Sequence, residues 1–166
     1  MNCEKELSVV ILCYNEELRI VKALQRVHSY LESQSYSWDV LIVLDGPTDE
    51  SHSKIDAFSR GRDNIRLISR RENKGKGFTV REGMLAARGR LRLFTDADNS
   101  TDISHFEKMK PLLDTGYDVV ICSRDSKDAA GVIQAIKQPD HNFPVRRKSP
   151  AYGDRSADWC NRDLFV

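Results

Sequence analysis

The chain has 166 residues, enough for one domain with a substantial hydrophobic core and too few for two large ones. Hydrophobic residues make up 40% of the chain and charged residues 31%, which is an ordinary globular balance. The formal net charge of +1 excludes a global attraction to nucleic acid or to an anionic membrane, so we expect no nucleic-acid partner.

The cysteines and the short apolar segments indicate the cellular compartment. No cysteine lies in a CxxC pair or at zinc-finger spacing, which favours reduced structural thiols in a cytosolic protein; the four are Cys3, Cys13, Cys122 and Cys160. Residues 1–6 lack the apolar stretch of a secretory signal, and no apolar run approaches the roughly 20 residues of a membrane span. We therefore expect a cytoplasmic protein whose membrane contact is at most peripheral, at the cytoplasmic face.

Apolar segments with strand and helix patterns alternate from residue 7 to residue 122. The first segment, LSVVILC, is typical of a strand that is buried on both faces. The next carries Ile20, Leu24, Val27 and Leu31 at helical spacing. In chain order we expect strands over 7–13, 40–44, 65–68, 91–95 and 119–122, and helices over 16–33, 48–60, 77–88 and 103–113. This alternation predicts βαβ units and a mainly parallel sheet flanked by helices.

Unusual polar residues follow three of the expected strands. They are Tyr14-Asn15-Glu16, Asp45 and Asp96-Ala97-Asp98. Because right-handed crossovers place the loops after parallel strands along one edge, these residues should lie near one another. Carboxylates gathered there suit a hard divalent cation and sugar hydroxyls. An Asp-x-Asp pair also arises by chance, and a solvated turn is the alternative; its place directly after the buried strand LRLF favours metal or ribose binding.

The segment Lys74-Gly75-Lys76-Gly77 enters the third expected helix. Backbone N–H groups at a helix start, together with lysine ammonium groups, suit phosphate. The segment is neither a dinucleotide fingerprint nor a P-loop, and a basic helix cap without a ligand remains the alternative interpretation.

Five segments in order, VVILCYNEE, LIVLDGPTDES, NKGKGFTVREGMLAARG, LFTDADNSTD and DVVICSRD, resemble the GT-A fold, family 2 glycosyltransferases. The likeness covers residues 7–125 and is strongest to the dolichyl-phosphate glucosyl- and mannosyltransferase branch. It implies a GT-A, Rossmann-like sheet, with residues 1–125 as the nucleotide-sugar-binding core. We expect residues 126–166 to be a polar, poorly ordered or truncated acceptor-side segment, in which 145–148 resembles the start of a basic acceptor segment.

The resemblance also implies roles for individual residues. The donor site would comprise Tyr14, Asn15, Glu16, Asp45, Lys76, Asp96, Ala97 and Arg124, and Asp98 with Asp96 would hold Mg²⁺ or Mn²⁺. Within that set, Tyr14 and Glu16 would line the nucleoside pocket, with Glu16 on a ribose hydroxyl, and Asp45 would accept from the base. Three residues depart from the family pattern: Leu44, Pro47 and Ser100. Ser100 stands where the mannosyltransferase branch often has a metal-side glutamine, which favours the glucosyltransferase side.

The implied reaction is an inverting transfer of a hexose from a nucleotide-diphosphate sugar, of the UDP-glucose or GDP-mannose type, to a polyprenyl phosphate or a glycan. Positive charge from Lys76 and from a divalent cation would oppose the charge on the departing nucleoside diphosphate. The sequence names no catalytic base. Two alternatives stay open: an inactive nucleotide-sugar-binding remnant, and a sugar nucleotidyltransferase. The second would carry a Gly-rich basic loop after the first strand, where this chain has CYNEE.

Overall fold

The computed structural model describes residues 5–98, 100–123, 132–136 and 162–165. The strands expected up to residue 122 are confirmed as β1 (Lys5–Cys13), β2 (Trp38–Asp45), β3 (Ile65–Arg70), β4 (Gly89–Asp96) and β5 (Val119–Ser123). The helices are α1 (Ile20–Glu32), α2 (Ser51–Ser59), α3 (Lys76–Ala86) and α4 (Phe106–Asp114), the last preceded by a 3₁₀ turn, η1 (Ile103–His105).

All of the described strands belong to one sheet, in the order β3-β2-β1-β4-β7-β5-β6. The pairs β3–β2, β2–β1 and β1–β4 are parallel, so the predicted mainly parallel sheet is confirmed. The chain begins at β1, moves outward through β2 and β3, and then returns to the other side of β1 as β4. The order of the strands therefore reverses between β1 and β4, and the carboxyl ends of strands at such a reversal form the usual ligand crevice of these sheets.

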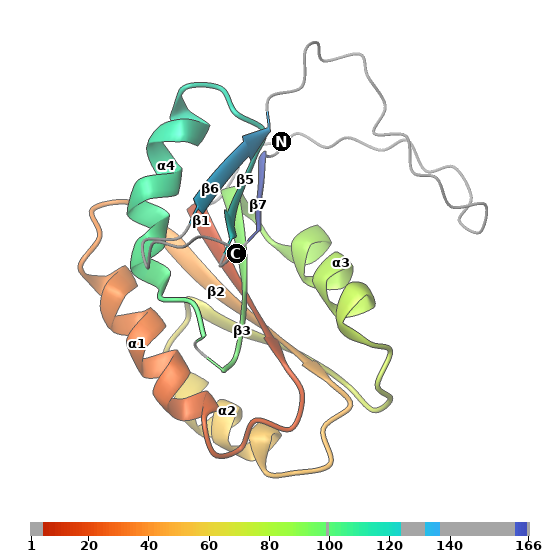
Figure 1. Ribbon diagram of the computed structural model, residues 1–166. Coiled ribbons are helices and arrows are strands. Elements are labelled where there is room, and N and C mark those ends of the chain that lie inside the picture. The colour runs from red at the N-terminus through yellow and green to blue at the C-terminus, as the bar shows by residue number, and fades with distance from the viewer. Residues whose placement is uncertain (1–4, 99, 124–131, 137–161, 166) are drawn as a thin grey trace, which may run out of the picture.

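Helices cover both faces of the sheet (Figure 1). On one face α1, α2 and α4 pack over the larger apolar cluster, to which β1 contributes Leu7, Val9 and Ile11. The other face of β1 presents Val10 and Leu12 to α3. Because successive strand residues point to opposite faces, the unbroken apolar run in β1 is buried on both, as its sequence predicts.

Helix α3 lies close to the sheet because residue 83 is glycine. A Cβ atom at Gly83 would overlap the side chain of Val10 on β1 and crowd that of Val43 on β2. The helix axis can therefore approach two central strands more closely than any larger residue would permit. This close contact sets the distance between the sheet and α3, whose first residue is Lys76.

Three helices begin differently from expectation. The helix predicted over 48–60 begins only at Ser51. The helix predicted over 16–33 begins only at Ile20, because the amides of Arg19 and Ile20 both bond to the Glu16 carbonyl (2.9 and 2.8 Å) and make a turn. The helix predicted over 103–113 begins as η1, whose amide at Ser104 donates to the Asp102 carboxylate (2.8 Å).

The sheet continues beyond the expected boundary at residue 125. Strand β6 (Val132–Ile136) pairs antiparallel with β5, and β7 (Arg162–Phe165) lies parallel between β4 and β5. These two strands were not expected from the sequence of the polar segment 126–166. Most of that segment, with the basic residues 145–148, lies outside the described residues. Within the part of the chain that the structure describes, no helix is both long and apolar enough to cross a membrane.

Candidate functional site

The polar residues that follow β1, β2 and β4 lie at the carboxyl edge of the sheet, as the parallel pairing requires (Figure 1). The register pairs Leu12 of β1 with Asp96 of β4, and the Ala97 amide donates to the Leu12 carbonyl (3.1 Å). This bond joins the Asp96-Ala97-Asp98 turn to the end of β1, at the place where the strand order reverses. The structure thus brings the Tyr14–Glu16 and Asp96–Asp98 segments together.

Two loops at this edge, β1–α1 and β2–α2, are held together by hydrogen bonds, most of them from a backbone amide to a side chain. The Asn15 side chain accepts from the Thr48 amide (2.8 Å) and donates to the Thr48 hydroxyl (3.0 Å). The amide of Glu17 donates to Asp49 (3.0 Å), and the amide of Glu50 donates to the Glu17 carboxylate (2.9 Å). Asn15 also has a left-handed backbone, with φ of 50°, a conformation that asparagine tolerates better than most residues. Its side chain therefore holds the β1–α1 loop in place; its predicted contact with a donor remains a prediction.

The carboxylate of Glu16 is already paired within the chain. It accepts from Arg19 Nε (2.8 Å) and Nη2 (3.0 Å), and the Glu16 amide donates to the Ser51 hydroxyl (2.8 Å). The Glu16 side chain is 17% exposed and that of Arg19 is 61% exposed. A ligand hydroxyl that approaches Glu16 would therefore share the carboxylate with the exposed Arg19 side chain or displace that side chain. Tyr14, next to it, is half exposed at the edge, where a planar ligand could lie on its ring.

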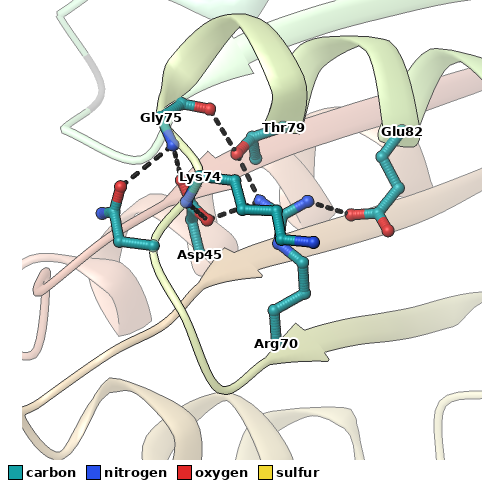
Figure 2. Close-up of polar contacts among 7 residues, drawn as sticks. Asp45, Arg70, Lys74, Gly75, Thr79 and Glu82 are labelled. Atoms are coloured by element: carbon teal, nitrogen blue, oxygen red, sulfur yellow. Dashed lines mark hydrogen bonds and ion pairs between the residues drawn. The ribbon is translucent and has the colours of Figure 1, made fainter.

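Asp45 is turned into the protein. Its side chain is 5% exposed and accepts from Arg70 Nη2 (2.5 Å) and from the amides of Lys74 and Gly75 (2.9 Å each), as Figure 2 shows. Burial would raise the pKa of Asp45, but the Lys74 amide and the Arg70 guanidinium outweigh it and hold the pKa below its usual value. The carboxylate is thus ionised and occupied by donors from the chain itself. Its predicted contact with a base remains a prediction.

Lys76 and Asp96 form an ion pair at the exposed rim of the site. The ammonium nitrogen lies 2.7 Å from Asp96 Oδ2, and the two side chains are 63% and 38% exposed. Nearby, Asp98 is exposed, and one of its carboxylate oxygens accepts from the Ser100 amide (2.8 Å). The chain therefore places one cation and two carboxylates together at the end of a buried strand.

The carboxylates of Asp96 and Asp98 fit a hard divalent cation in chemistry, because Mg²⁺ and Mn²⁺ prefer oxygen ligands. Among the described residues there is no group of three or more His, Cys, Asp or Glu side chains placed to hold a metal ion. Mg²⁺ in proteins is usually bound by one or two carboxylates, while substrate phosphate and water supply its remaining ligands. Arg124, the last predicted donor residue, lies outside the described residues.

Sequence reasoning missed several residues that shape this edge. Arg70 binds Asp45, Thr79 and Glu82, and Asp49 with Thr48 holds the β1–α1 loop. In the sequence, Arg70 is only a basic residue ahead of the Lys74–Gly77 segment. No local pattern marks Glu82 as its partner, because their contact depends on how α3 crosses the end of β3.

Comparison with known proteins gives the chain its family. The family model described as glycosyl transferase family 2 matches residues 8–158. The chain belongs to glycosyl transferase family 2. This membership favours the glycosyltransferase interpretation over the sugar nucleotidyltransferase alternative.

Curated relatives of this family 2 chain include dolichyl-phosphate beta-glucosyltransferases. The protein of Drosophila melanogaster is 38% identical over 115 residues, which are 65% of this chain and 35% of the relative. That of Saccharomyces cerevisiae is 40% identical over 109 residues, 62% of this chain and 33% of the relative. The chain thus spans about a third of the length of the curated relatives that it matches.

Solved structures confirm the GT-A type of fold. A mannosyltransferase from Pyrobaculum calidifontis, PcManGT, in complex with GDP-Man and Mn²⁺, superimposes with a TM-score of 0.59 at 23% identity, over 72% of this chain and 36% of that one. Staphylococcus aureus TarS 1-349 in complex with UDP-GlcNAc gives a TM-score of 0.56 at 22% identity, over 74% and 36% of the two chains. At these identities the likeness concerns the fold alone.

Proposed function

We propose that this chain is the donor-binding part of an inverting glycosyltransferase that moves a hexose from a nucleotide-diphosphate sugar to a polyprenyl phosphate. The pairing of Lys76 with Asp96, beside Asp98, carries this proposal. It gathers a cation and two carboxylates at the strand reversal, where this type of sheet binds ligands. The dolichyl-phosphate beta-glucosyltransferases among the curated relatives support glucose as the sugar and a polyprenyl phosphate as the acceptor.

Asp96 and Asp98 would hold the divalent cation, for which we propose Mn²⁺ or Mg²⁺; the neighbour PcManGT was solved with Mn²⁺. When bound, such an ion neutralises charge on the diphosphate and so favours its departure. The Lys76 ammonium adds a second positive charge on the same side of the ligand. It can leave Asp96 for a phosphate oxygen without a large loss, because the ion pair is exposed to solvent.

Glu16 and Tyr14 would bind the nucleoside, on the β1 side of the same edge. The Glu16 carboxylate would accept from a ribose hydroxyl, and the half-exposed Tyr14 ring would lie against the base or the ribose. An acceptor phosphate is already an anion, so the transfer needs little help from a general base. We also propose that residues 1–125 suffice for donor recognition, and that acceptor binding depends on chain beyond them.

Calorimetry with UDP-glucose, GDP-mannose and other donors, with Mn²⁺ or with EDTA, tests this proposal. We expect one donor to bind in the presence of the ion. The change Asp98→Asn, which keeps the shape and removes the charge, should weaken that binding at least about tenfold, or 1.4 kcal/mol. Asp63→Asn is the matched control, since Asp63 is exposed in the α2–β3 turn at the opposite edge of the sheet. Equal affinity of the Asp98 variant and the parent, with and without EDTA, would exclude the metal assignment.

Transfer of labelled glucose to dolichyl phosphate separates an active enzyme from a binding remnant. Because the chain spans about a third of its curated relatives, we expect donor binding to survive better than transfer. Without residues that bind the acceptor, the two reactants would lose the mutual orientation from which much of the rate of such a reaction comes. Full transfer by these 166 residues alone would contradict the division into donor and acceptor parts.

A further inference from the structure

A buried ion pair lies directly behind the exposed rim of the site. Asp45 and Arg70 are the last residues of β2 and β3, and the strand register pairs them. Their side chains are 5% and 11% exposed, and the nearest nitrogen and oxygen atoms are 2.5 Å apart. At such low exposure the pair is little screened by water, and removal of one partner leaves a buried charge.

The Arg70 guanidinium joins β3 to helix α3. The nitrogen that binds Asp45 also donates to the Thr79 hydroxyl (2.6 Å), and Nη1 donates to the Glu82 carboxylate. The Phe78 ring covers the group, with its centroid 4.8 Å from Cζ. Figure 2 shows the guanidinium between Asp45 on one side and α3 on the other. Only the planar, forked head of arginine can serve partners on both sides at once.

Asp45 in turn fixes the start of α3. Its two oxygens accept from the amides of Lys74 and Gly75 (2.9 Å each), the two residues that precede the helix. No side chain caps the helix from its own N-cap position, which Gly75 occupies with φ of 85°. The segment also passes so close to β2 that a Cβ atom at Gly46 would overlap the Asn73 backbone nitrogen. The two amides directly before the helix are therefore held by a carboxylate from another strand, and the Gly75 amide also donates to the Asn73 side chain (2.9 Å).

Lys76 is the first residue of α3, directly after the segment that Asp45 holds. Its own ion pair with Asp96 is too exposed to hold a loop, because surface pairs of this kind contribute at most about 1 kcal/mol. The segment that leads into Lys76 must therefore be held by its hydrogen bonds to the buried Asp45. We propose that Arg70 is a positioning residue, which acts through Asp45 to place the Lys76 ammonium at the donor edge of the site. This inference rests on the proposed function in one respect, that Lys76 faces the diphosphate.

A double-mutant cycle tests whether Arg70 acts through Lys76. Arg70→Lys keeps the charge and removes the fork; we expect the affinity for UDP with Mn²⁺ to fall at least about fivefold, and that of Lys76→Ala about tenfold. If both act through one group, the double variant should bind about as weakly as Lys76→Ala alone, whereas independent effects would multiply to about fiftyfold. A multiplied loss would overturn the proposal, and so would parental affinity in Arg70→Lys.

Arg66→Lys is the matched control for a general loss of stability. Arg66 also lies on β3, pairs with a buried aspartate of β2, Asp39 (2.9 Å), and donates to a carbonyl of α3, at Ala86 (3.3 Å). It differs from Arg70 in position, because it lies near the amino end of the strand. We expect Arg66→Lys to bind UDP within twofold of the parent. An equal loss in both variants would mean that Arg70 serves only the fold.

Hydrogen exchange, measured without any nucleotide, tests separately whether Arg70 orders the Lys74–Gly75 segment through Asp45. The amides of Lys74 and Gly75, which donate to Asp45, should exchange at least about tenfold faster in Arg70→Lys than in the parent or in Arg66→Lys. Should Arg70→Lys fail to fold, Glu82→Gln weakens the same anchor more gently and should accelerate both amides about threefold. Unchanged exchange would refute the positioning role even if the nucleotide binds. Faster exchange in a chain whose parent binds no nucleotide would uphold it and refute the proposed function instead.

Discussion

Replacement of Lys76 by alanine should separate binding from stability. The Lys76–Asp96 pair joins two side chains that are 63% and 38% exposed, at 2.7 Å. Exposed pairs of this kind contribute about 0.2–1 kcal/mol, and at these exposures we expect the lower half of that range. A hydrogen bond from an ammonium to a phosphate is stronger, about 1.5–3 kcal/mol when shielded. At a half-open rim we expect about 1.4 kcal/mol, which is a tenfold change in Kd.

The assay pairs urea denaturation with calorimetric titration of UDP in Mn²⁺. Lys110→Ala is the control, because Lys110 pairs with Asp114 at a similar distance (2.8 Å). The Lys110 side chain is less exposed than that of Lys76, 31% against 63%, and the two aspartates are 43% and 38% exposed. The Lys110–Asp114 pair lies in the last turn of α4, away from the carboxyl edge of the sheet (Figure 1). Both variants should unfold at nearly the parental urea concentration, and only Lys76→Ala should lose affinity. Equal affinities would refute the placement of Lys76 beside the diphosphate, and a loss of more than about 2 kcal/mol of stability would show that the pair is structural.

Three further predictions concern stability and reactivity. Leu91→Ala, at a fully buried position of β4, should lower the free energy of unfolding by about 2–5 kcal/mol in urea titrations, and a change below 1 kcal/mol would contradict the packing of the sheet centre. The hydrogen bond from Arg90 lowers the pKa of Glu6, so this contribution to stability is present above the unfolded pKa near 4.5 and is lost as the pH falls through the lower folded value. Glu6→Gln should therefore flatten the fall in stability below pH 5 in acid titrations followed by circular dichroism. An unchanged slope would contradict the contribution of the Arg90–Glu6 hydrogen bond to stability. Burial raises the pKa of the Cys13 thiol to about 12, so iodoacetamide at pH 8 should label Cys13 in urea but hardly in the folded protein, as mass spectrometry can measure; rapid labelling of the folded chain would refute its burial.

The edge of the sheet at which the site forms could be predicted, because the pattern that marks it lies within short stretches of sequence. Each strand is an apolar run that ends at a polar residue, and parallel strands connected by right-handed crossovers end along one side. Tyr14, Asp45 and Asp96 could therefore be assigned to one edge before any contact was known. The same reasoning missed β7, whose four residues carry no apolar run and which pairs between β4 and β5 across a long sequence separation.

Apolar periodicity and chain direction suffice to predict the alternation of strands and helices, the parallel sheet and the gathering of carboxylates at its carboxyl edge. The direction in which each polar side chain turns depends instead on contacts that form in the folded chain. Asp45 faces inward to Arg70, and Asn15 is taken up by Thr48, whereas the Lys76–Asp96 pair remains open to solvent. Each of these contacts joins residues 20 or more positions apart. Their geometry depends on strand register and on how closely α3 packs on the sheet. Neither can be predicted from the residues that neighbour these side chains in the sequence.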